Sequence, residues 1–346
     1  MGRENKIRVL VVDDSIVFRE VLSRGISSDL RIEVVATATD PFDARDKILE
    51  YKPDVMTCDV QMPKMNGIEF IKRLLPQYQL PVVVVSGVSD AVFDAMNVGA
   101  VDFVTKPDVK SPKSVENFIY ELIETIKIAA NAKVSPYKKK IAKKKKEKFE
   151  TDSSKIIAIG ASTGGTNAIY TILKGLPSDI PGIVIVQHIP PVFSSMFAER
   201  LNNSISLSVK EATSGDYVEK GRVLIAPGDQ HMRIKKVGDR YKVECFKKNK
   251  VNGHCPSVDV LFESVAKVAE SHAIGVILTG MGYDGAKGLL MMKRKGARTI
   301  GQDEKSSVVY GMPKVAYRIG AVQKQADLEN IAYLIYTMLR KGSENR

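Results

Sequence analysis

The sequence predicts an α/β protein with two domains. In both halves of the 346-residue chain, short apolar runs rich in valine and isoleucine alternate with amphipathic segments. This is the pattern of buried parallel strands alternating with helices. The chain is also longer than one hydrophobic core usually organises. We expect a first domain over residues 1–128, a linker over 129–153 and a second domain over 154–346.

The first domain is expected to be one doubly wound sheet. Helix-like segments such as Ile16–Ile26 and 67–75 separate apolar runs of strand length. Five repeats of this kind in about 120 residues suit a single domain of this type. The five expected strands are residues 7–12, 31–38, 54–59, 81–86 and 101–106.

The second domain resumes the alternation with longer spacings, and we expect an α/β core with an antiparallel insertion. The insertion is residues 232–246, which look like a β-hairpin that turns at Gly238 and Asp239. The expected strands of the core are residues 155–160, 182–187, 222–227, 273–280 and 297–302.

The charge of the chain is concentrated in one segment. The net charge is +12, and residues 138–148 contain eight lysines and one glutamate, which is +7 and leaves +5 for the rest. Such a block predicts a solvated, Lys-rich linker, and no zinc-finger or helix-turn-helix pattern accompanies it. We therefore expect no nucleic-acid partner. No run approaches the roughly 18 apolar residues of a membrane span, so we expect no membrane insertion and a cytoplasmic location.

Polar side chains stand at the ends of four expected strands of the first domain. Asp13 and Asp14 follow the first apolar run, Asp59 ends the third, Ser86 the fourth and Lys106 the fifth. In a doubly wound sheet, ligands bind beyond the carboxyl ends of the strands. Carboxylates offer oxygen ligands to Mg²⁺, and a lysine and a hydroxyl could hold a phosphoryl group. The pattern predicts an aspartate that accepts phosphate.

Residues 7–128 resemble the receiver domain of two-component signalling in four motifs: VVDDS, DVQMPKMNG, VVSGV and VTKP. The resemblance implies that Asp59 accepts the phosphoryl group. It also implies that Asp13, Asp14, Asp59 and the main chain of Gln61 surround Mg²⁺. The residues implied to contact the phosphoryl group or to respond to it are Lys106, Ser86 and Phe103.

A glycine-rich turn opens the second domain. Residues 160–164, GASTG, satisfy the G-x-S-x-G pattern between an expected strand and an amphipathic helix. Such a turn presents a nucleophilic serine or cradles a phosphate at a helix start. A dinucleotide loop would require glycine at Ser162 and an acid at the end of the next strand. That strand ends in Gln187 and His188 instead, so the pattern favours a nucleophile.

Two further residues are candidates for acid–base chemistry. His188 follows the strand next to the one that presents the serine, so its imidazole could take the serine proton; His231, also in a loop, is the alternative. Asp284 lies in a glycine-dense turn and could orient the histidine, or it could cap the following helix. The main-chain N–H groups of Thr163 and Met281 are candidate oxyanion donors. The order Ser–His–Asp is not that of α/β-hydrolases.

Residues 154–341 are similar to the catalytic domain of the chemotaxis protein-glutamate methylesterase family, in which this domain follows a receiver. The matching stretches include GASTGG, QHIPPVFSSMFAERL, HCPSVDVLF and ILTGMGYDGAKGL. The resemblance implies a catalytic triad of Ser162, His188 and Asp284, a main-chain donor from Met281 and no cofactor in the esterase site. Cys255 stands where we expect arginine in the family.

Together, the resemblances imply a phosphorylation-activated serine hydrolase of bacterial chemotaxis. It would demethylate glutamate methyl esters and deamidate glutamines on chemoreceptors, and a chemotaxis histidine kinase would phosphorylate it. We expect the unphosphorylated receiver to block access to the Ser162 turn. Two other hypotheses stay open: an adaptor whose second domain only binds, and a transcriptional regulator that uses the basic segment on DNA.

Overall fold

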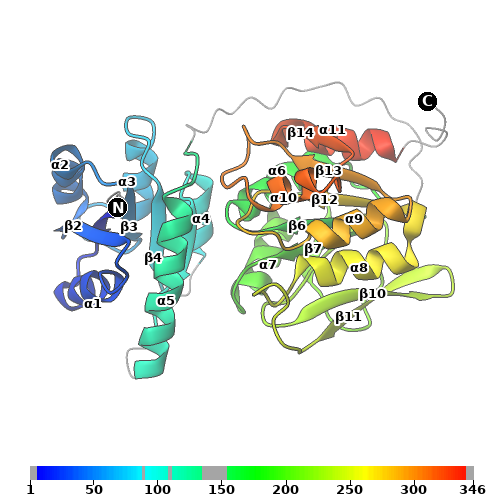
Figure 1. Cartoon of the computed structure of the whole chain (residues 1–346), viewed down its shortest axis with the longest axis horizontal. Coiled ribbons are helices and arrows are strands. Elements are labelled where there is room, and N and C mark those ends of the chain that lie inside the picture. Colours follow the sequence, from blue (N-terminus) through cyan, green and yellow to red (C-terminus); the bar gives the residue numbers. More distant parts are fainter. Residues whose placement is uncertain (1–5, 88–89, 108–110, 135–153, 340–346) are drawn as a thin grey trace. The chain divides into compact units, whose positions relative to one another are not determined.

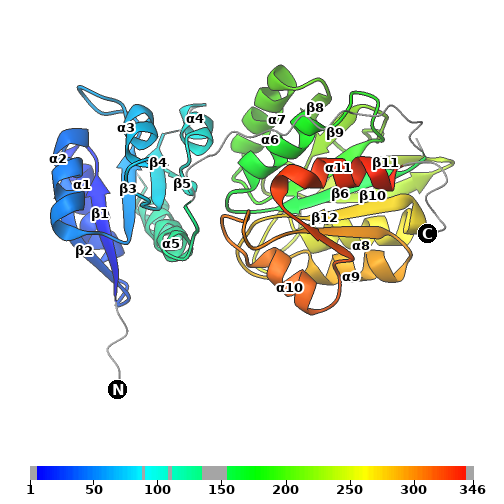
Figure 2. The ribbon, with the colours of Figure 1, turned by 90° about the horizontal axis from the view of Figure 1, so that it is seen from above.

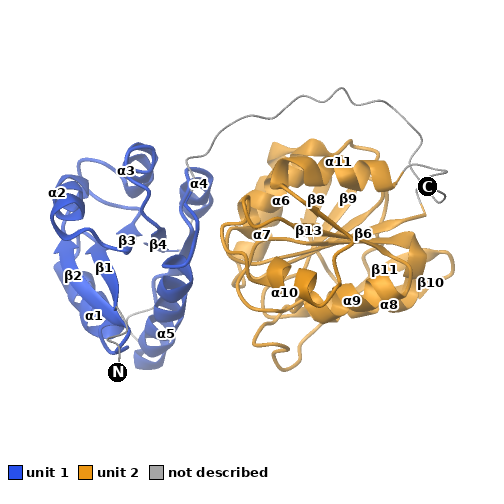
Figure 3. Cartoon of the chain, turned by 45° about the horizontal axis from the view of Figure 1, so that its top comes forward, with its two compact units in different colours: residues 1–139 blue, residues 140–346 orange. Residues whose placement is uncertain are grey.

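The computed structural model describes residues 6–87, 90–107, 111–134 and 154–339. They fall into two compact units, within residues 1–139 and 140–346 (Figure 3). Each unit is built on a parallel sheet, so the predicted α/β fold class is confirmed. The linker expected over 129–153 lies mostly outside the described residues, and its bounds stay a prediction.

The first unit contains a five-stranded parallel sheet of order β2-β1-β3-β4-β5 (Figure 1). The strands arise where the sequence predicts them, because valine-rich runs pack well when both faces of a sheet are buried. Every residue of β3 and β4 is buried. The strands are β1 (Ile7–Val12), β2 (Ile32–Ala38), β3 (Val55–Asp59), β4 (Val82–Ser86) and β5 (Asp102–Thr105).

Helices cover both faces of this sheet. Helices α1 and α5 contact each other on one face, and α3 and α4 contact each other on the opposite face beside α2 (Figures 1 and 2). The hydroxyl of Ser15 and the amide of Asn66 cap α1 and α3 by accepting main-chain N–H bonds. The helices are α1 (Ile16–Ile26), α2 (Pro41–Tyr51), α3 (Gly67–Leu74), α4 (Ala91–Asn97) and α5 (Pro112–Ala129).

The second unit contains a seven-stranded parallel sheet of order β14-β13-β12-β6-β7-β9-β8. Its three central strands, β12, β6 and β7, are buried along their whole length. The strands are β6 (Ile156–Ala161), β7 (Ile183–Gln187), β8 (Ser208–Glu211), β9 (Arg222–Ile225), β12 (Ala273–Ile277), β13 (Arg298–Gln302) and β14 (Lys324–Ala326).

Helices α6, α7 and α11 lie on one face of this sheet, and α8, α9 and α10 lie on the other (Figure 2). Within each helical layer neighbouring helices pack together: α6 contacts α11 on one face, and α8 contacts α9 on the other. The elements are α6 (Gly165–Gly175), α7 (Phe193–Ser204), α8 (Val258–Val268), the short 3₁₀ helix η1 (Glu270–His272), α9 (Ala286–Arg294), α10 (Met312–Arg318) and α11 (Leu328–Met338).

The expected antiparallel insertion is present. Strands β10 (His231–Val237) and β11 (Arg240–Phe246) form a two-stranded hairpin that turns at Gly238 and Asp239. Strands β8 and β14 were not predicted from the sequence. Both are short strands at the edges of the sheet, and several of their residues are exposed, so they lack a continuous apolar run.

The topology brings the candidate residues to the two positions at which strand order reverses. In the first sheet β1 lies between β2 and β3, and in the second β6 lies between β12 and β7. At such positions the direction of strand order reverses, and a crevice opens beyond the carboxyl ends of the strands. Asp13 follows β1 and Asp59 ends β3 at the first of these positions, and Ser162 follows β6 at the second.

Within the described parts of the chain, no helix is both long enough and apolar enough to cross a membrane. The cytoplasmic location stays a prediction.

Candidate active site and phosphorylation site

Ser162 lies in a tight turn between β6 and α6. Its main-chain N–H donates a hydrogen bond to the carbonyl oxygen of Thr279 (3.0 Å), and its carbonyl oxygen accepts one from the N–H of Gly165 (2.6 Å). Gly164 has φ of +76°, in the left-handed region that favours glycine. The main chain therefore fixes the turn, and the Ser162 side chain is not needed to hold it.

The loop after β12 passes directly against the serine. A Cβ atom on Gly280 would lie 2.6 Å from the Cβ of Ser162, so a larger residue at 280 would push the loop away. Met281 follows at once and is half exposed. Thr163 and Met281, the two expected oxyanion donors, thus directly follow Ser162 and Gly280, two residues that lie against each other.

The side chain of Gln187 ties the serine turn to the loop that carries His188. Its amide nitrogen Nε2 donates to the carbonyl oxygens of Ser162 (2.9 Å) and His188 (3.0 Å). The main-chain N–H of His188 donates to the carbonyl oxygen of Ala161 (3.1 Å). Gln187 is buried. In the sequence, Gln187 was notable only because it stands where a dinucleotide-binding loop would require an acidic residue. The sequence contained no sign that its side chain would connect these two loops.

His188 pairs with Asp284. Its Nε2 atom lies 3.0 Å from Oδ2 of Asp284, and both side chains are almost fully buried. Its other ring nitrogen, Nδ1, is buried and makes no hydrogen bond with the residues that the structure describes. When the proton is on Nε2 and is donated to the carboxylate, Nδ1 carries the lone pair of a base. The sequence-predicted histidine and aspartate therefore meet.

Asp284 lies in a cradle of hydrogen-bond donors. Its Oδ1 accepts bonds from Oγ of Ser257 (2.8 Å) and Nδ2 of Asn252 (2.7 Å), and its Oδ2 accepts one from the N–H of Val258 (2.6 Å). Burial alone would raise the pKa of this carboxyl, but its bonds with His188, Asn252 and Val258 outweigh burial and hold the pKa well below its ordinary value. The group is therefore an anion at neutral pH.

The structure decides against the alternative interpretation of Asp284 as a cap of the following helix. Helix α9 begins at Ala286 after Gly285, and no side chain caps it. Instead, the carboxylate accepts from the main chain at the start of α8, at Val258 and Asp259. Asn252 and Ser257, which help to hold it, were missed from the sequence because they are distant from Asp284 in the chain.

His231, the alternative base, is fully buried among main-chain groups. Its Nδ1 accepts a hydrogen bond from the N–H of Ser257 (3.2 Å), and its Nε2 lies 3.0 Å from the carbonyl oxygen of Asn249. Both ring nitrogens are therefore engaged in holding loops together. The geometry favours His188 as the histidine available for proton transfer.

His254 is a further residue of the site that the sequence did not single out. Its ring stacks on the ring of His188, with centroids 3.7 Å apart and planes inclined by 10°. Burial first, and the neighbouring His188 second, lower the pKa of His254 to about 4. The only sequence signal was its place in HCPSVDVLF, one of the stretches that carried the family resemblance.

The lowered pKa of His254 predicts a pH dependence of stability. The unfolded chain binds a proton at this histidine below pH 6.5, whereas the folded chain does so only below about pH 4. Folding stability from this group is therefore lost as the pH falls between these values and is constant below them. We expect His254→Phe to remove this loss, worth about 3 kcal/mol. Urea unfolding of both proteins from pH 7.5 to 4 measures it; parallel curves would contradict it.

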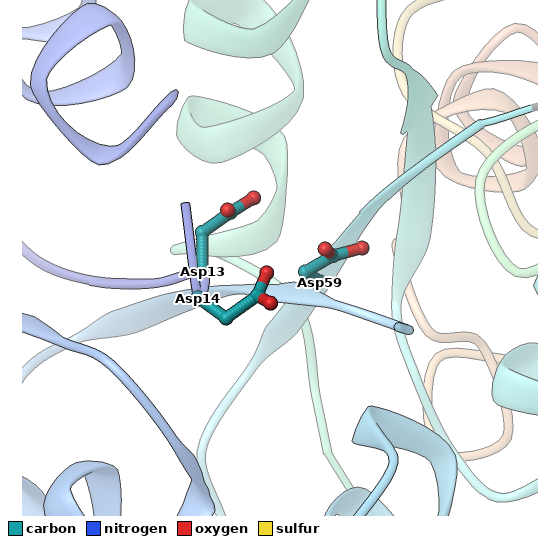
Figure 4. A group of neighbouring side chains, drawn as sticks. All are labelled: Asp13, Asp14 and Asp59. Atoms are coloured by element: carbon teal, nitrogen blue, oxygen red, sulfur yellow. The ribbon is translucent and has the colours of Figure 1, made fainter. Parts of the chain in front are cut away.

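In the first unit, three carboxylates gather where β1 and β3 end (Figure 4). One oxygen from each of Asp13, Asp14 and Asp59 lies within 4.8 Å of the others. The Nζ atom of Lys106 bridges Oδ2 of Asp13 (2.8 Å) and Oδ2 of Asp59 (2.7 Å). The main-chain N–H of Gln61 donates to Oδ1 of Asp59 (3.3 Å). The sequence-predicted residues thus come together, and their oxygen donors fit a hard cation such as Mg²⁺.

Lys106 affects the pKa of the neighbouring carboxyl group of Asp13, and the carboxylates affect the pKa of Lys106. Burial raises the pKa of Asp13, although Lys106 opposes the shift. Burial would lower the pKa of Lys106, but its bonds to Asp13 and Asp59 outweigh burial and raise it. Lys106 therefore stays a cation beside the carboxylates. The remaining predicted residues lie at the same end or alongside: Ser86 is buried at the end of β4, and Phe103 is buried in β5 against Phe93 of α4.

Comparison with known proteins gives two family matches. Residues 157–335 match the family described as CheB methylesterase, and residues 9–112 match the response regulator receiver domain. The protein-glutamate methylesterase/protein-glutamine glutaminase 2 of Syntrophomonas wolfei is 56% identical over 339 residues, 98% of this chain and 99% of that protein. The protein-glutamate methylesterase/protein-glutamine glutaminase of Syntrophotalea carbinolica is 48% identical over 345 residues, 96% of this chain and 98% of that protein.

A solved structure resembles the second unit. The crystal structure of the Thermotoga maritima CheB methylesterase catalytic domain matches with a TM-score of 0.52 and 38% identity. The match covers 53% of this chain and 98% of that chain. The sequence matches and the structural match therefore agree on the second unit.

Proposed function

The chain belongs to the CheB methylesterase family, and on that premise we propose that Ser162, His188 and Asp284 are its catalytic triad. The protein is a response-regulator-controlled protein-glutamate methylesterase/protein-glutamine glutaminase of chemotaxis adaptation. The observation that carries the triad is the 3.0 Å hydrogen bond between Nε2 of His188 and Asp284, which leaves the buried Nδ1 as a base.

In the proposed mechanism, Ser162 Oγ attacks the carbonyl carbon of a glutamate methyl ester while Nδ1 of His188 takes its proton. The Asp284 anion stabilises the imidazolium that forms. The N–H groups of Thr163 and Met281 stabilise the tetrahedral oxyanion. The intermediate then expels methoxide, which leaves as methanol with the proton from His188, and a glutamyl ester on Ser162 remains.

In the second half of the cycle, water is the nucleophile and Ser162 Oγ is the leaving group. Nδ1 of His188 takes a proton from water, and the hydroxide attacks the glutamyl ester. Collapse of this intermediate breaks its bond to Ser162 Oγ, which recovers a proton from His188 and leaves a free glutamate side chain. A glutamine amide follows the same path with ammonia as the leaving group. Because an amide is less reactive than an ester, we expect demethylation to be faster than deamidation.

Receiver domains carry a Mg²⁺-dependent phosphorylation site, and we propose that Asp59 is the acceptor. Asp13, Asp14, Asp59 and the main chain of Gln61 would hold the ion, which neutralises phosphoryl charge when bound. Lys106 Nζ, already 2.7 Å from Asp59 Oδ2, would contact the phosphoryl oxygens. We propose a histidine kinase as the phosphodonor and methylated chemoreceptors as the substrates.

Asp59→Asn should abolish stimulation of methanol release by a phosphodonor, because an amide cannot accept a phosphoryl group. The measurement is the rate of methanol release from methylated receptor, with and without acetyl phosphate and Mg²⁺. Asp54→Asn is the matched control, since Asp54 lies just before the opposite end of β3 and is exposed. It should keep the stimulation.

A chelator in the same assay tests the two sites separately. We expect it to remove the stimulation and to leave the unstimulated rate unchanged, because the mechanism proposed for Ser162 uses no metal ion. Stimulation that persists in Asp59→Asn would contradict the assignment of Asp59.

A further inference from the structure

We propose that His254 is a positioning residue for the catalytic base: its ring face fixes the plane of the His188 ring. The inference rests on the proposed role of His188. The stacked arrangement supports it, with centroids 3.7 Å apart and planes inclined by only 10°. His188 is held at one edge by its bond from Nε2 to Asp284. A single hydrogen bond leaves a ring free to turn about the bond axis, and a flat neighbour on its face removes that freedom.

The turn that carries His254 is anchored on the same carboxylate as His188. Main-chain hydrogen bonds close this turn in both directions between Val251 and His254 (2.9 and 3.0 Å). Within it, Nδ2 of Asn252 donates to Oδ1 of Asp284 (2.7 Å), while Oδ2 of Asp284 pairs with His188. Asp284 thus holds both the base and, through the turn, the ring that stacks on it. The two rings keep a fixed relation because they share one anchor.

The charge of His254 suits this role. His188 becomes a cation in each half of the catalytic cycle, and a neutral ring face attracts a cation whereas a second cation would repel it. The charged groups that face His254 are His188, Asp284 and Lys250. Burial, His188 and Lys250 disfavour its protonation and Asp284 favours it, with the balance strongly toward the neutral ring. His254 therefore presents an uncharged face at neutral pH.

The test compares flat and non-flat replacements in the full-length protein. His254→Phe keeps a flat ring but has no nitrogen, so it cannot carry a proton. His254→Leu and His254→Met fill similar space without a flat face. We expect kcat for methanol release to stay within about twofold of wild type for Phe and to fall about fivefold to tenfold for Leu and Met, the size of one ring-stacking contact. KM for methylated receptor should not change in any of them.

Matched substitutions at His272 control for the loss of a histidine as such, because His272 is exposed in η1. Thermal unfolding of each variant checks that it is folded. Two variants without a flat ring are used so that the test still stands if one of them does not fold. A wild-type kcat in both His254→Leu and His254→Met would overturn the proposal. It would also be overturned if kcat fell as far in His254→Phe as in the other two variants. A change confined to KM would overturn it too, since it would place His254 against the substrate.

The wild type and Ser162→Ala are assayed alongside. Methanol release by the wild type that is absent from Ser162→Ala supports the proposed function whatever the His254 variants do. The two claims can therefore fail separately.

Discussion

Replacing Ser162 by alanine should lower phosphodonor-stimulated methanol release by at least about 10,000-fold, as expected when the nucleophile of a triad is removed. The physical reason is that alanine has no hydroxyl with which to form the glutamyl ester. The fold should survive, because the main chain of residue 162 makes the hydrogen bonds to Thr279 and Gly165. The measurement is methanol release from methylated receptor under single-turnover conditions.

Ser204→Ala is the control for this substitution. Ser204 ends α7, is exposed, and its hydroxyl donates only to the main chain of Arg200 within the described structure. We expect it to keep the wild-type rate. Methanol release by Ser162→Ala within tenfold of wild type would contradict the nucleophile assignment.

The second large effect is expected for Asp284→Asn, which should lower kcat about 1,000- to 10,000-fold, as tautomer disruption does in a triad. Both carboxylate oxygens of Asp284 accept hydrogen bonds. Oδ1 accepts from Ser257, Asn252 and the N–H of Asp259, and Oδ2 accepts from Val258 and His188. An asparagine amide must point its NH₂ group at one of these two sets of donors. If the NH₂ group faces His188, it requires the lone pair on Nε2 and moves the proton to Nδ1, which removes the base. If the NH₂ group faces the other set, it leaves those buried donors without an acceptor.

Asp239→Asn controls for the loss of one carboxylate, since Asp239 lies exposed in the hairpin turn between β10 and β11. It should leave kcat unchanged. An Asp284→Asn enzyme with kcat near that of wild type, and with an unchanged unfolding midpoint, would show that Asp284 does not orient the base.

The sheet cores could be predicted from the sequence because their signal is local. Continuous apolar runs rich in valine or isoleucine mark β4, β6 and β7, all of which are buried along their length. The edge strands β8 and β14 carry no such run, because an exposed edge does not require apolar residues on both faces. Their pairing depends on the neighbouring strand, which the local pattern does not contain.

In the candidate site, too, some residues have a local signal in the sequence and others do not. Ser162 and Asp284 lie in glycine-rich turns whose need for left-handed backbone is visible in the sequence, at Gly164 and Gly285. The groups that hold these residues in place come from distant parts of the chain. Asn252 reaches Asp284 across 32 positions, and the face of His254 meets His188 only because two loops converge. Periodicity and spacing contain no signal for such contacts.

The central claim is that Ser162 performs the ester hydrolysis and that phosphorylation of the receiver determines its rate. The most direct measurement is methanol release from methylated receptor by the wild type and by Ser162→Ala, each with and without the phosphodonor. The account predicts release by the wild type that rises with the phosphodonor, and no release by Ser162→Ala in either condition. Phosphodonor-stimulated release by Ser162→Ala would contradict it.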